Sequence, residues 1–308
     1  MAVHTQQSEF GTAPRAPKSG TAERLLFMLL VFPNLFLFFV FNYYPFLYNG
    51  YLSFVRWDML APIKPWVGLE NYRYLFTNPG FGRIMTNTFV FTVSSVALIG
   101  ILGLAMAMLL NQALRGRNVV RAIVFSPVML SGAAIGMVWI YILDPRFGLL
   151  DVFIRALGGI SPNWLLDVRW AMAALVMVYV WKNVGYSVVI FLAGLKAIPA
   201  ELYEAARVDG AGGWARFVHV TLPGLSPVMF FLIVTSVLSS FQSFDLIQVM
   251  TGGGPVDATT TLIYYLYEEG FVGFNAGRAG VAAMVLFAIM LAFTLVQLRR
   301  GEKAVHYA

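Results

Sequence analysis

The chain has 308 residues, of which 59% are hydrophobic and only 12% are charged, and its mean hydropathy is +0.74. Soluble domains carry about 25% charged residues, so this composition excludes an ordinary soluble protein and indicates a polytopic membrane protein. The net charge of +6 does not indicate a nucleic-acid partner, because the basic residues lie between the apolar runs rather than in one patch. No cysteine is present, and His4 and His306 lie at the chain ends, which excludes disulfides and leaves no basis for a metal site.

Six apolar runs are long enough to cross a bilayer, which takes about 20 apolar residues. Before them, residues 1–24 are polar, are rich in small residues and lack the pattern of a cleaved signal peptide, so we expect a disordered tail there. Residues 301–308 form a second tail, and 25–300 form one transmembrane domain. The predicted fold class is all-α, with six transmembrane helices at about 25–48, 87–110, 120–143, 170–195, 224–244 and 279–298.

The distribution of lysine and arginine predicts that both termini are cytoplasmic. With the N-terminus inside, the inner segments carry twelve basic residues and the outer segments carry eight, while Lys182 lies within a span. The inner segments are also shorter, which enlarges the difference in density. Because an excess of basic residues marks cytoplasmic loops, we expect residues 196–223, here named the charged segment, to be cytoplasmic.

The charged segment contains the sequence "ELYEAARVDGAGGWARFVHVTLP", residues 201–223. Pro199 and Glu201 suit the start of a helix, Gly210 suits its end, and Gly212-Gly213 suits a bend. The sequence therefore predicts a short helix, a glycine elbow and a second short helix that project from the membrane. Such a segment either lies on the bilayer or docks into the cleft of a partner. Interfacial helices are rich in lysine and arginine, so the balance of acidic and basic residues here favours a protein partner.

This segment resembles the EAA loop of permeases from ATP-binding-cassette (ABC) importers. The family pattern is E-A-A-x-x-x-G, about nine residues, and then I-x-L-P, and Val220 replaces the isoleucine here. The pieces "DGAG" and "TLP", with "GLKAIPAELYEAA" before them and "TGGGPVDATTTLIYYLYEEGF" after them, are similar to the carbohydrate-uptake branch, of the maltose and glycerol-3-phosphate permease type. The resemblance covers about residues 24–300. It implies that the residues that couple to the ATPase are Glu204, Ala205, Ala206, Asp209, Gly210, Leu222 and Pro223.

The resemblance also implies a fold, a location and a set of partners. The fold is a type I importer permease bundle in the bacterial cytoplasmic membrane, and the charged segment sits in a groove of a cytoplasmic ATPase dimer. A homologous second permease subunit and an external substrate-binding protein complete the transporter. ATP and Mg²⁺ would be bound by the ATPase and no cofactor by this chain. In agreement, the chain has no G-x-x-x-x-G-K-[ST] motif and no Gly-Lys pair, so it is not expected to be an enzyme that hydrolyses ATP by a P-loop.

Polar residues in the fourth and fifth runs mark a candidate solute path. Ionisable residues within spans cost about 2.5–3.5 kcal/mol at a helix centre and are functional by default. In the family these two spans supply the solute site, and the candidates at or near those positions are Trp181, Lys182, Asn183, Tyr186, Ser236, Ser239, Ser240, Gln242, Ser243 and Asp245. The four serines recur at helical spacing, which predicts one polar face. Hydroxyls, amides and aromatic faces suit a polyol, and Lys182 also suits an anionic group.

Two structural alternatives stand beside that interpretation. In the first, Lys182 lies only a turn or two deep in its span and snorkels to the outer surface. In the second, the serines serve only in helix packing.

The predicted function is import of a sugar, or of a related polyol such as glycerol 3-phosphate. An alternative is a secondary transporter driven by an ion gradient, which predicts buried acidic residues in mid-span and internal repeats, whereas only Asp245 lies near a span. A membrane scaffold that transports nothing would need neither the polar face nor the elbowed segment.

Overall fold

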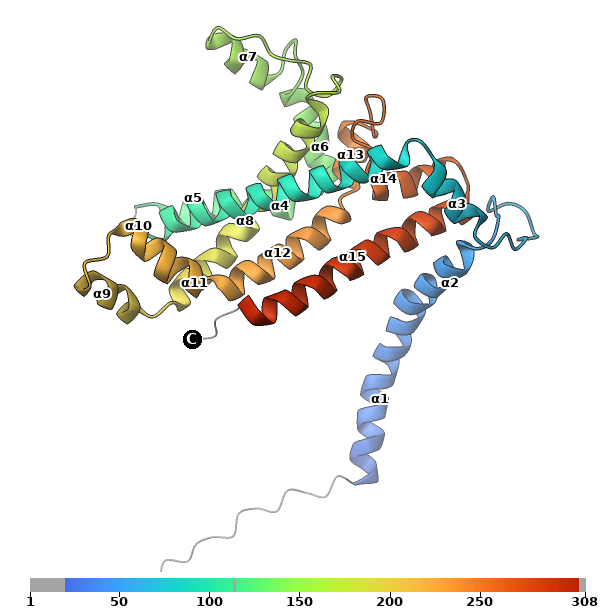
Figure 1. The fold of residues 1–308 in the computed structure, drawn as a ribbon, viewed down its shortest axis with the longest axis horizontal. Helices are drawn as coiled ribbons and strands as arrows, with labels where there is room; N and C mark the ends of the chain where they lie inside the picture. The colour runs from blue at the N-terminus through green and yellow to red at the C-terminus, as the bar shows by residue number, and fades with distance from the viewer. Residues whose placement is uncertain (1–19, 113–114, 305–308) are drawn as a thin grey trace, which may run out of the picture. The chain divides into compact units, whose positions relative to one another are not determined.

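The computed structural model describes residues 20–112 and 115–304, and within these residues the regular secondary structure is helical, with one isolated bridge between Val55 and Trp66 (Figure 1). Most of the predicted N-terminal tail and residues 305–308 lie outside the described residues. Residues 21–24 are already helical, and the last helix continues to Ala304, inside the predicted C-terminal tail. The α-helices are α1 (Thr21–Phe38), α2 (Tyr44–Leu52), α3 (Glu70–Thr77), α4 (Phe81–Asn111), α5 (Arg117–Phe125), α6 (Gly132–Ile142), α7 (Leu149–Ala156), α8 (Ala171–Ala197), α9 (Ala200–Val208), α10 (Gly213–Arg216), α11 (Leu222–Gly224), α12 (Ser226–Phe241), α13 (Asp245–Met250), α14 (Leu262–Tyr267) and α15 (Ala276–Ala304).

Four shorter helical stretches join these elements. Three of them are π-helical, η1 (Phe39–Tyr43), η3 (Phe217–Thr221) and η4 (Glu268–Val272), and η2 (Ser126–Met129) is a 3₁₀ turn. The chain divides into two units, residues 1–48 and 49–308. In the first unit, none of the side chains from Arg24 to Tyr48 is buried, and nearly all of them are apolar. A helix that is apolar on every side suits a lipid environment.

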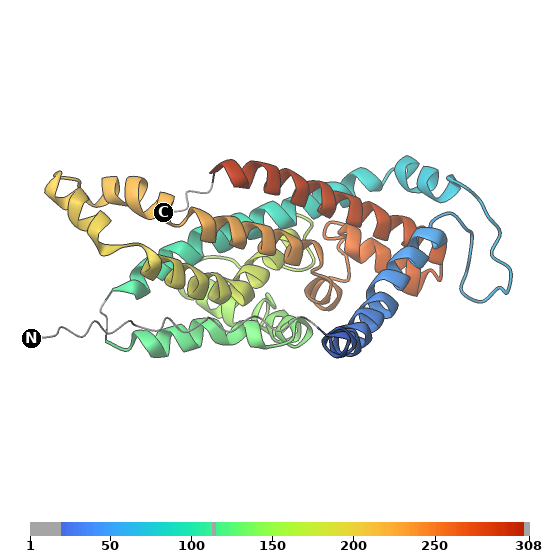
Figure 2. The ribbon, with the colours of Figure 1, turned by 90° about the horizontal axis from the view of Figure 1, so that it is seen from below.

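The core of the second unit is built by four long helices, α4, α8, α12 and α15, which run alongside one another (Figures 1 and 2). The central helix is α8, which buries side chains along most of its length against α4, α5, α12 and α13. Small residues let these helices approach closely. A Cβ on Gly103 of α4 would lie 2.8 Å from the Cβ of Ser187, and a Cβ on Gly185 would overlap the backbone of α5 at Val124.

The third apolar run is bent rather than straight, which corrects the prediction of one continuous helix there, and the fifth run begins at a second bend. The chain turns by 106° between Arg117–Met129 and Gly132–Ile142, and by 64° between Gly213–Gly224 and Ser226–Phe241. The 106° bend falls at Leu130 and Ser131, whose backbone is extended, and the 64° bend falls at Leu225, two residues before Pro227. Four described helices are long and apolar enough to span a membrane, and there are six spans when each bent pair is taken as one.

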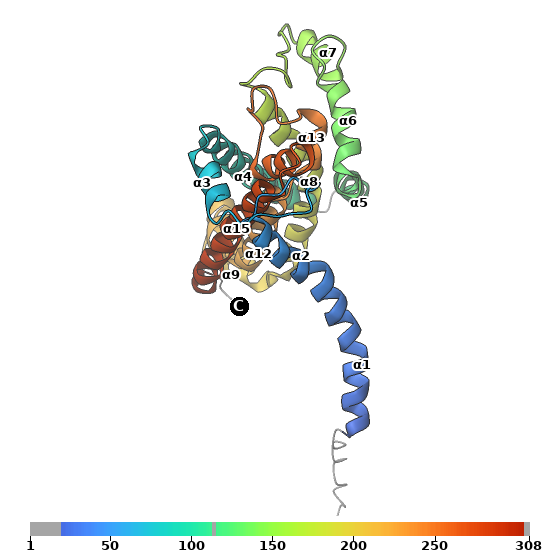
Figure 3. The same cartoon turned by 90° about the vertical axis from the view of Figure 1, so that its right-hand side faces the viewer.

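The end of the bundle next to α3 is closed by a loop that is fastened to α4. The loop, residues 251–261, follows α13, and Figure 3 views this end of the second unit. Arg83 Nη1 donates to the carbonyl of Val256 at 3.0 Å, and Asn87 Nδ2 donates to the carbonyls of Asp257 and Thr260 at 2.8 and 3.1 Å. These bonds hold a backbone in which Val256 and Asp257 both have positive φ, so the loop is a shaped and anchored element.

Candidate functional site

The first half of the charged segment is a short helix with a well-formed C-terminal stop. Helix α9 ends where Gly210 adopts φ of +78°. The amide of Gly210 donates to the carbonyl of Arg207 at 3.0 Å, and the amide of Ala211 donates to the carbonyl of Ala206 at 2.8 Å. This pair of bonds around a left-handed glycine is a Schellman motif, so the predicted stop at Gly210 is confirmed.

The second half folds back beside the first. After the predicted elbow, Gly212 is extended and caps α10, which continues through η3 and α11 into α12. The hydroxyl groups of Tyr203 on α9 and Thr221 on η3 lie 3.0 Å apart in a hydrogen bond. A Cβ on Gly224 would lie 2.9 Å from the side chain of Ile198. The charged segment is therefore a compact helical hairpin with defined internal contacts.

Most of the residues predicted to couple to the ATPase lie on the open surface of this hairpin. Glu204, Ala205, Asp209, Gly210 and Pro223 are exposed, while Ala206 and Leu222 are half-buried. No ion pair involves Glu204 in the part of the chain that the structure describes.

Three large apolar side chains share this surface, of which the sequence singles out Trp214 by its spacing from Phe217 and Val218 but not Leu202 or Val208. Leu202 is 46%, Val208 88% and Trp214 76% exposed. The signal was present, because large apolar residues flank the small residues of a short and otherwise polar helix. Together they make a hairpin surface with small residues in the middle and apolar side chains around them, which suits contact with another protein.

The predicted solute-path residues on α8 lie in different surroundings. Trp181 packs edge-on against Trp139 of α6, with ring centroids 5.4 Å apart, and lines a cavity of about 670 Å³ beside α4. Asn183 is half-buried, and its Nδ2 donates to the carbonyl of Tyr179 at 2.8 Å. Lys182 is half-buried and Tyr186 is 38% exposed. Lys182 also lies deeper than predicted, about three turns after the start of α8 at Ala171.

The predicted serine face is only partly correct. Helix α12 ends at Phe241, so Ser243 lies outside it and cannot continue the face. Ser236 is half-buried, Ser239 is exposed, and buried Ser240 donates to the carbonyl of Val237 at 2.8 Å. The helix ends there because the chain must turn into α13, and this turn leaves the hydroxyl of Ser243 buried without a partner among the described residues.

The last two candidates lie at this turn. Gln242 is exposed, and so is Asp245, which begins α13. Asp245 Oδ1 accepts a hydrogen bond from the amide of Leu246 at 2.9 Å. Its carboxylate also occupies the space where a Cβ of Gly132 would lie. Asp245 therefore sits at the start of α6, where the positive end of a helix favours a carboxylate, and brings the turn after α12 against the break in the third run.

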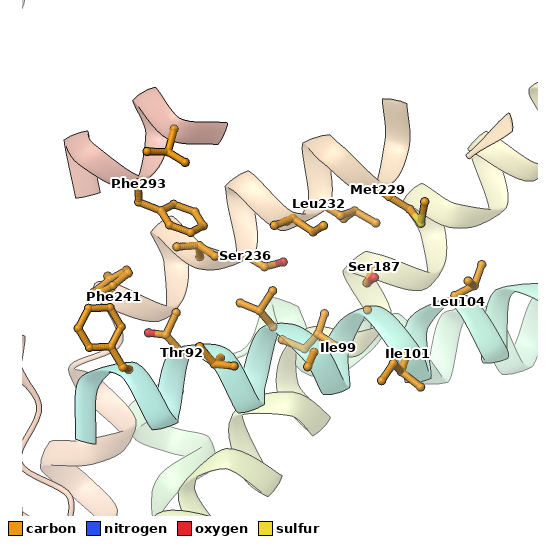
Figure 4. A pocket seen from close by; sticks show the side chains of 18 of the residues that line it. Thr92, Ile99, Ile101, Leu104, Ser187, Met229, Leu232, Ser236, Phe241 and Phe293 are labelled. Carbon is orange, nitrogen blue, oxygen red and sulfur yellow. The ribbon is translucent and has the colours of Figure 1, made fainter. Parts of the chain in front are cut away.

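An apolar cavity on the second unit does not bring the candidates together. It has a volume of about 800 Å³ and lies among α4, α8, α12 and α15 (Figure 4). Of the predicted residues only Ser236 lines it, with Thr92 and Ser187 as the other polar residues. The hydroxyls of Thr92 and Ser187 have no hydrogen-bond partner among the described residues. So apolar a lining does not suit a polyol.

Glu268 is one of several titratable groups outside the spans whose pKa is shifted. Burial raises the pKa of Glu268, on η4, and the nearby carboxylates of Asp257 and Glu269 add to the effect. The carboxylate of Glu269 has polar partners, because it accepts a hydrogen bond from the hydroxyl of Tyr265 at 2.9 Å and lies 3.6 Å from Arg278. Within the described residues, no group of three or more histidine, aspartate and glutamate side chains forms a metal-binding cluster.

Comparison with known proteins decides the family. Residues 99–300 match the model of the binding-protein-dependent transport system inner membrane component. The chain belongs to this family. It is 36% identical over 286 residues to the sn-glycerol-3-phosphate transport system permease protein UgpA of Brucella abortus biovar 1, covering 92% of this chain and 97% of that protein. It is 35% identical over 280 residues to UgpA of Yersinia pestis, covering 91% and 95%.

Solved structures agree on the fold. A bacterial alginate ABC transporter in complex with an alginate pentasaccharide-bound periplasmic protein contains a chain that matches with a TM-score of 0.80 at 22% identity, covering 93% of this chain and 97% of that one. A second structure of a bacterial ABC transporter that imports alginate matches with a TM-score of 0.78 at 23% identity. The predicted all-α importer permease fold is confirmed.

Family membership also settles the general role of the chain. It is a multi-pass inner-membrane permease subunit of a binding-protein-dependent ABC importer, and it works with an ATPase and a periplasmic binding protein. ATP hydrolysis belongs to the separate ATPase subunit, and the family implies no cofactor in this chain. The alternatives of an ion-driven transporter and of a scaffold are excluded.

Proposed function

We propose that this chain pairs with a homologous second permease subunit and imports a sugar or a polyol phosphate, with glycerol 3-phosphate as the leading solute. Support comes from relatives of about the same length that are named as sn-glycerol-3-phosphate permeases. In this proposal both chain termini face the cytoplasm, and the charged segment receives the motion of the ATPase.

The observation that carries the coupling role is the surface of the helical hairpin. Its two halves are tied by the Tyr203–Thr221 hydrogen bond, so a force on α9 passes to η3 and then along α11 into α12. Exposed Val208 and Trp214 would be removed from water by a partner's groove. Burial of a large apolar side chain contributes about 1.5–3 kcal/mol, and Glu204 between them would add a charged contact that sets the register.

The coupling role is tested with a charge reversal and a matched control. Glu204→Lys should leave the membrane complex assembled but separate ATP hydrolysis from uptake. Glu201→Lys makes the same change on the same helix, one turn earlier and outside the E-A-A motif, and should have a smaller effect. Uptake by Glu204→Lys at the wild-type rate would contradict the coupling role.

The solute is tested by reconstitution. The complex of both permeases and the ATPase is placed in proteoliposomes, and its ATPase activity is measured with the binding protein and a panel of sugars and glycerol phosphates. Stimulation by one member of the panel supports the importer proposal and identifies the solute. Hydrolysis that responds to no member would contradict the proposed solute class.

A further inference from the structure

Lys182 has a position that no other charged residue shares in the described part of the chain. It alone lies more than ten residues from both ends of a candidate span. It follows Ala171, the first residue of α8, by 11 positions, which corresponds to roughly 16 Å of helix. A lysine stem of four carbons is much shorter than this distance. Snorkelling to the end of the helix therefore does not account for the ammonium group.

The described residues supply no counter-charge for Lys182. No ion pair or hydrogen bond involves its side chain among the described residues. Asp245, the acid in the turn after α12, is engaged with the amide of Leu246 and packs on Gly132. A charge within a span normally pairs with another group or faces a water-filled cavity, so the partner of Lys182 comes from outside this chain.

The side chain of Lys182 lies on a strip of α8 that the rest of the chain leaves uncovered. Lys182, Tyr186, Val189, Ala193 and Lys196 are exposed or half-buried, while most other positions in this half of the helix are buried. Their spacing of four, three, four and three residues places them on one helix face. The strip runs from the middle of α8 to its last turn, the course expected of a path through the membrane.

We infer that Lys182 binds the anionic group of the transported solute, so that the importer selects polyol phosphates over neutral sugars. This inference rests on the proposed function and narrows its solute class. A lysine ammonium is a compact charge with three donors that suits phosphate oxygens. One turn along the strip, the hydroxyl of Tyr186 is placed for the polyol portion. Asn183 is adjacent, and because its Nδ2 is bonded to Tyr179, its Oδ1 is the group left to accept from a solute hydroxyl.

The competing explanation is an ion pair with an acidic residue of the second permease subunit. The two explanations differ in what removal of the charge does. A lost solute contact weakens transport of anionic solutes alone, whereas a lost ion pair leaves an unpaired acid in the membrane and weakens assembly, or transport of every solute.

The experiment uses the full complex in proteoliposomes with saturating binding protein. Uptake kinetics are measured for glycerol 3-phosphate and for the neutral solutes of the panel, with three variants: Lys182→Met, Lys182→Gln and Lys182→Arg. Lys182→Arg is the control that keeps the positive charge at this position. Assembly and basal ATPase activity are measured for each variant.

The expected result is a fall of about tenfold to a hundredfold in kcat/KM for glycerol 3-phosphate in Lys182→Met and Lys182→Gln. Lys182→Arg should stay within a few-fold of wild type, and assembly should be unchanged. The inference is overturned by unchanged uptake in Lys182→Met, by an equal loss for neutral solutes, or by failed assembly of both neutral variants. A wild-type complex that transports only neutral sugars overturns the inference alone, whereas one that transports no member of the panel overturns the proposed function as well.

Discussion

Gly185 is the position where the packing of α8 against α5 should be least tolerant of added volume. A Cβ there would overlap the carbonyl of Val124 and lie 2.8 Å from the Cα of Phe125. Carbon atoms in contact prefer about 3.5–4.0 Å, and the atoms in the way are backbone, which no rotamer change can move. The alanine variant must therefore separate the two helices, and overpacking of this kind costs about 1–3 kcal/mol.

Gly100 provides the matched control, because it is also a helical glycine, on α4, and a Cβ there would meet nothing within 4 Å. Gly100→Ala should stabilise slightly, by about 0.5–1 kcal/mol, through helix propensity. Thermal unfolding of the purified complex in detergent, followed by tryptophan fluorescence, compares the two variants. The reasoning is refuted if Gly185→Ala unfolds at the wild-type temperature, or if Gly100→Ala loses as much stability.

Three further predictions concern the connecting segments. Gly210→Ala places a side chain at φ of +78°, costs about 1–2 kcal/mol and should speed hydrogen exchange in α9; Gly212→Ala, at φ of −66° with open space around it, should not, and equal exchange in both variants would contradict the strain argument. Tyr203→Phe removes the bond to Thr221 and should destabilise the hairpin by about 0.5–1.5 kcal/mol, seen as faster proteolysis within 200–223; an unchanged cleavage rate would count against that bond. Because burial raises the pKa of Glu268, the folded chain favours the protonated carboxyl group. The stability that protonated Glu268 contributes is therefore lost as the pH rises. Glu268→Gln should therefore raise the unfolding temperature at pH 7 more than at pH 4, and the reverse order would show that the carboxylate is stabilised rather than desolvated.

The sequence predicted well those features that local chemistry determines. The fourth apolar run was placed at 170–195, and α8 extends over Ala171–Ala197, because its boundaries coincide with the change in polarity. Gly210 was placed at the end of a helix, and its positive φ and Schellman bonds agree, since few other residues adopt that backbone conformation.

Features that depend on packing were not predictable in the same way. The third run stays apolar through Pro127 and Gly132, so hydropathy gave no sign of the 106° bend, beside which Asp245 of α13 approaches Gly132. The prediction of one polar face wrongly included Ser243, because residue spacing alone does not show where α12 ends. The separation of Ser236, in the apolar cavity, from Lys182, on the open strip of α8, likewise depends on how the helices pack.

The measurement that tests the central claim most directly is the accessibility of one residue on the charged segment. The chain has no cysteine, so Val208→Cys introduces a single thiol at a position that is 88% exposed. Val256→Cys, at a position that is 74% exposed in the loop beyond α13, is the control at the opposite end of the bundle. The account predicts that an impermeant maleimide labels Val208→Cys only from the cytoplasmic side and that bound ATPase protects it, while Val256→Cys is labelled from outside and is unaffected by the ATPase. Equal labelling of Val208→Cys with and without the ATPase would contradict the account.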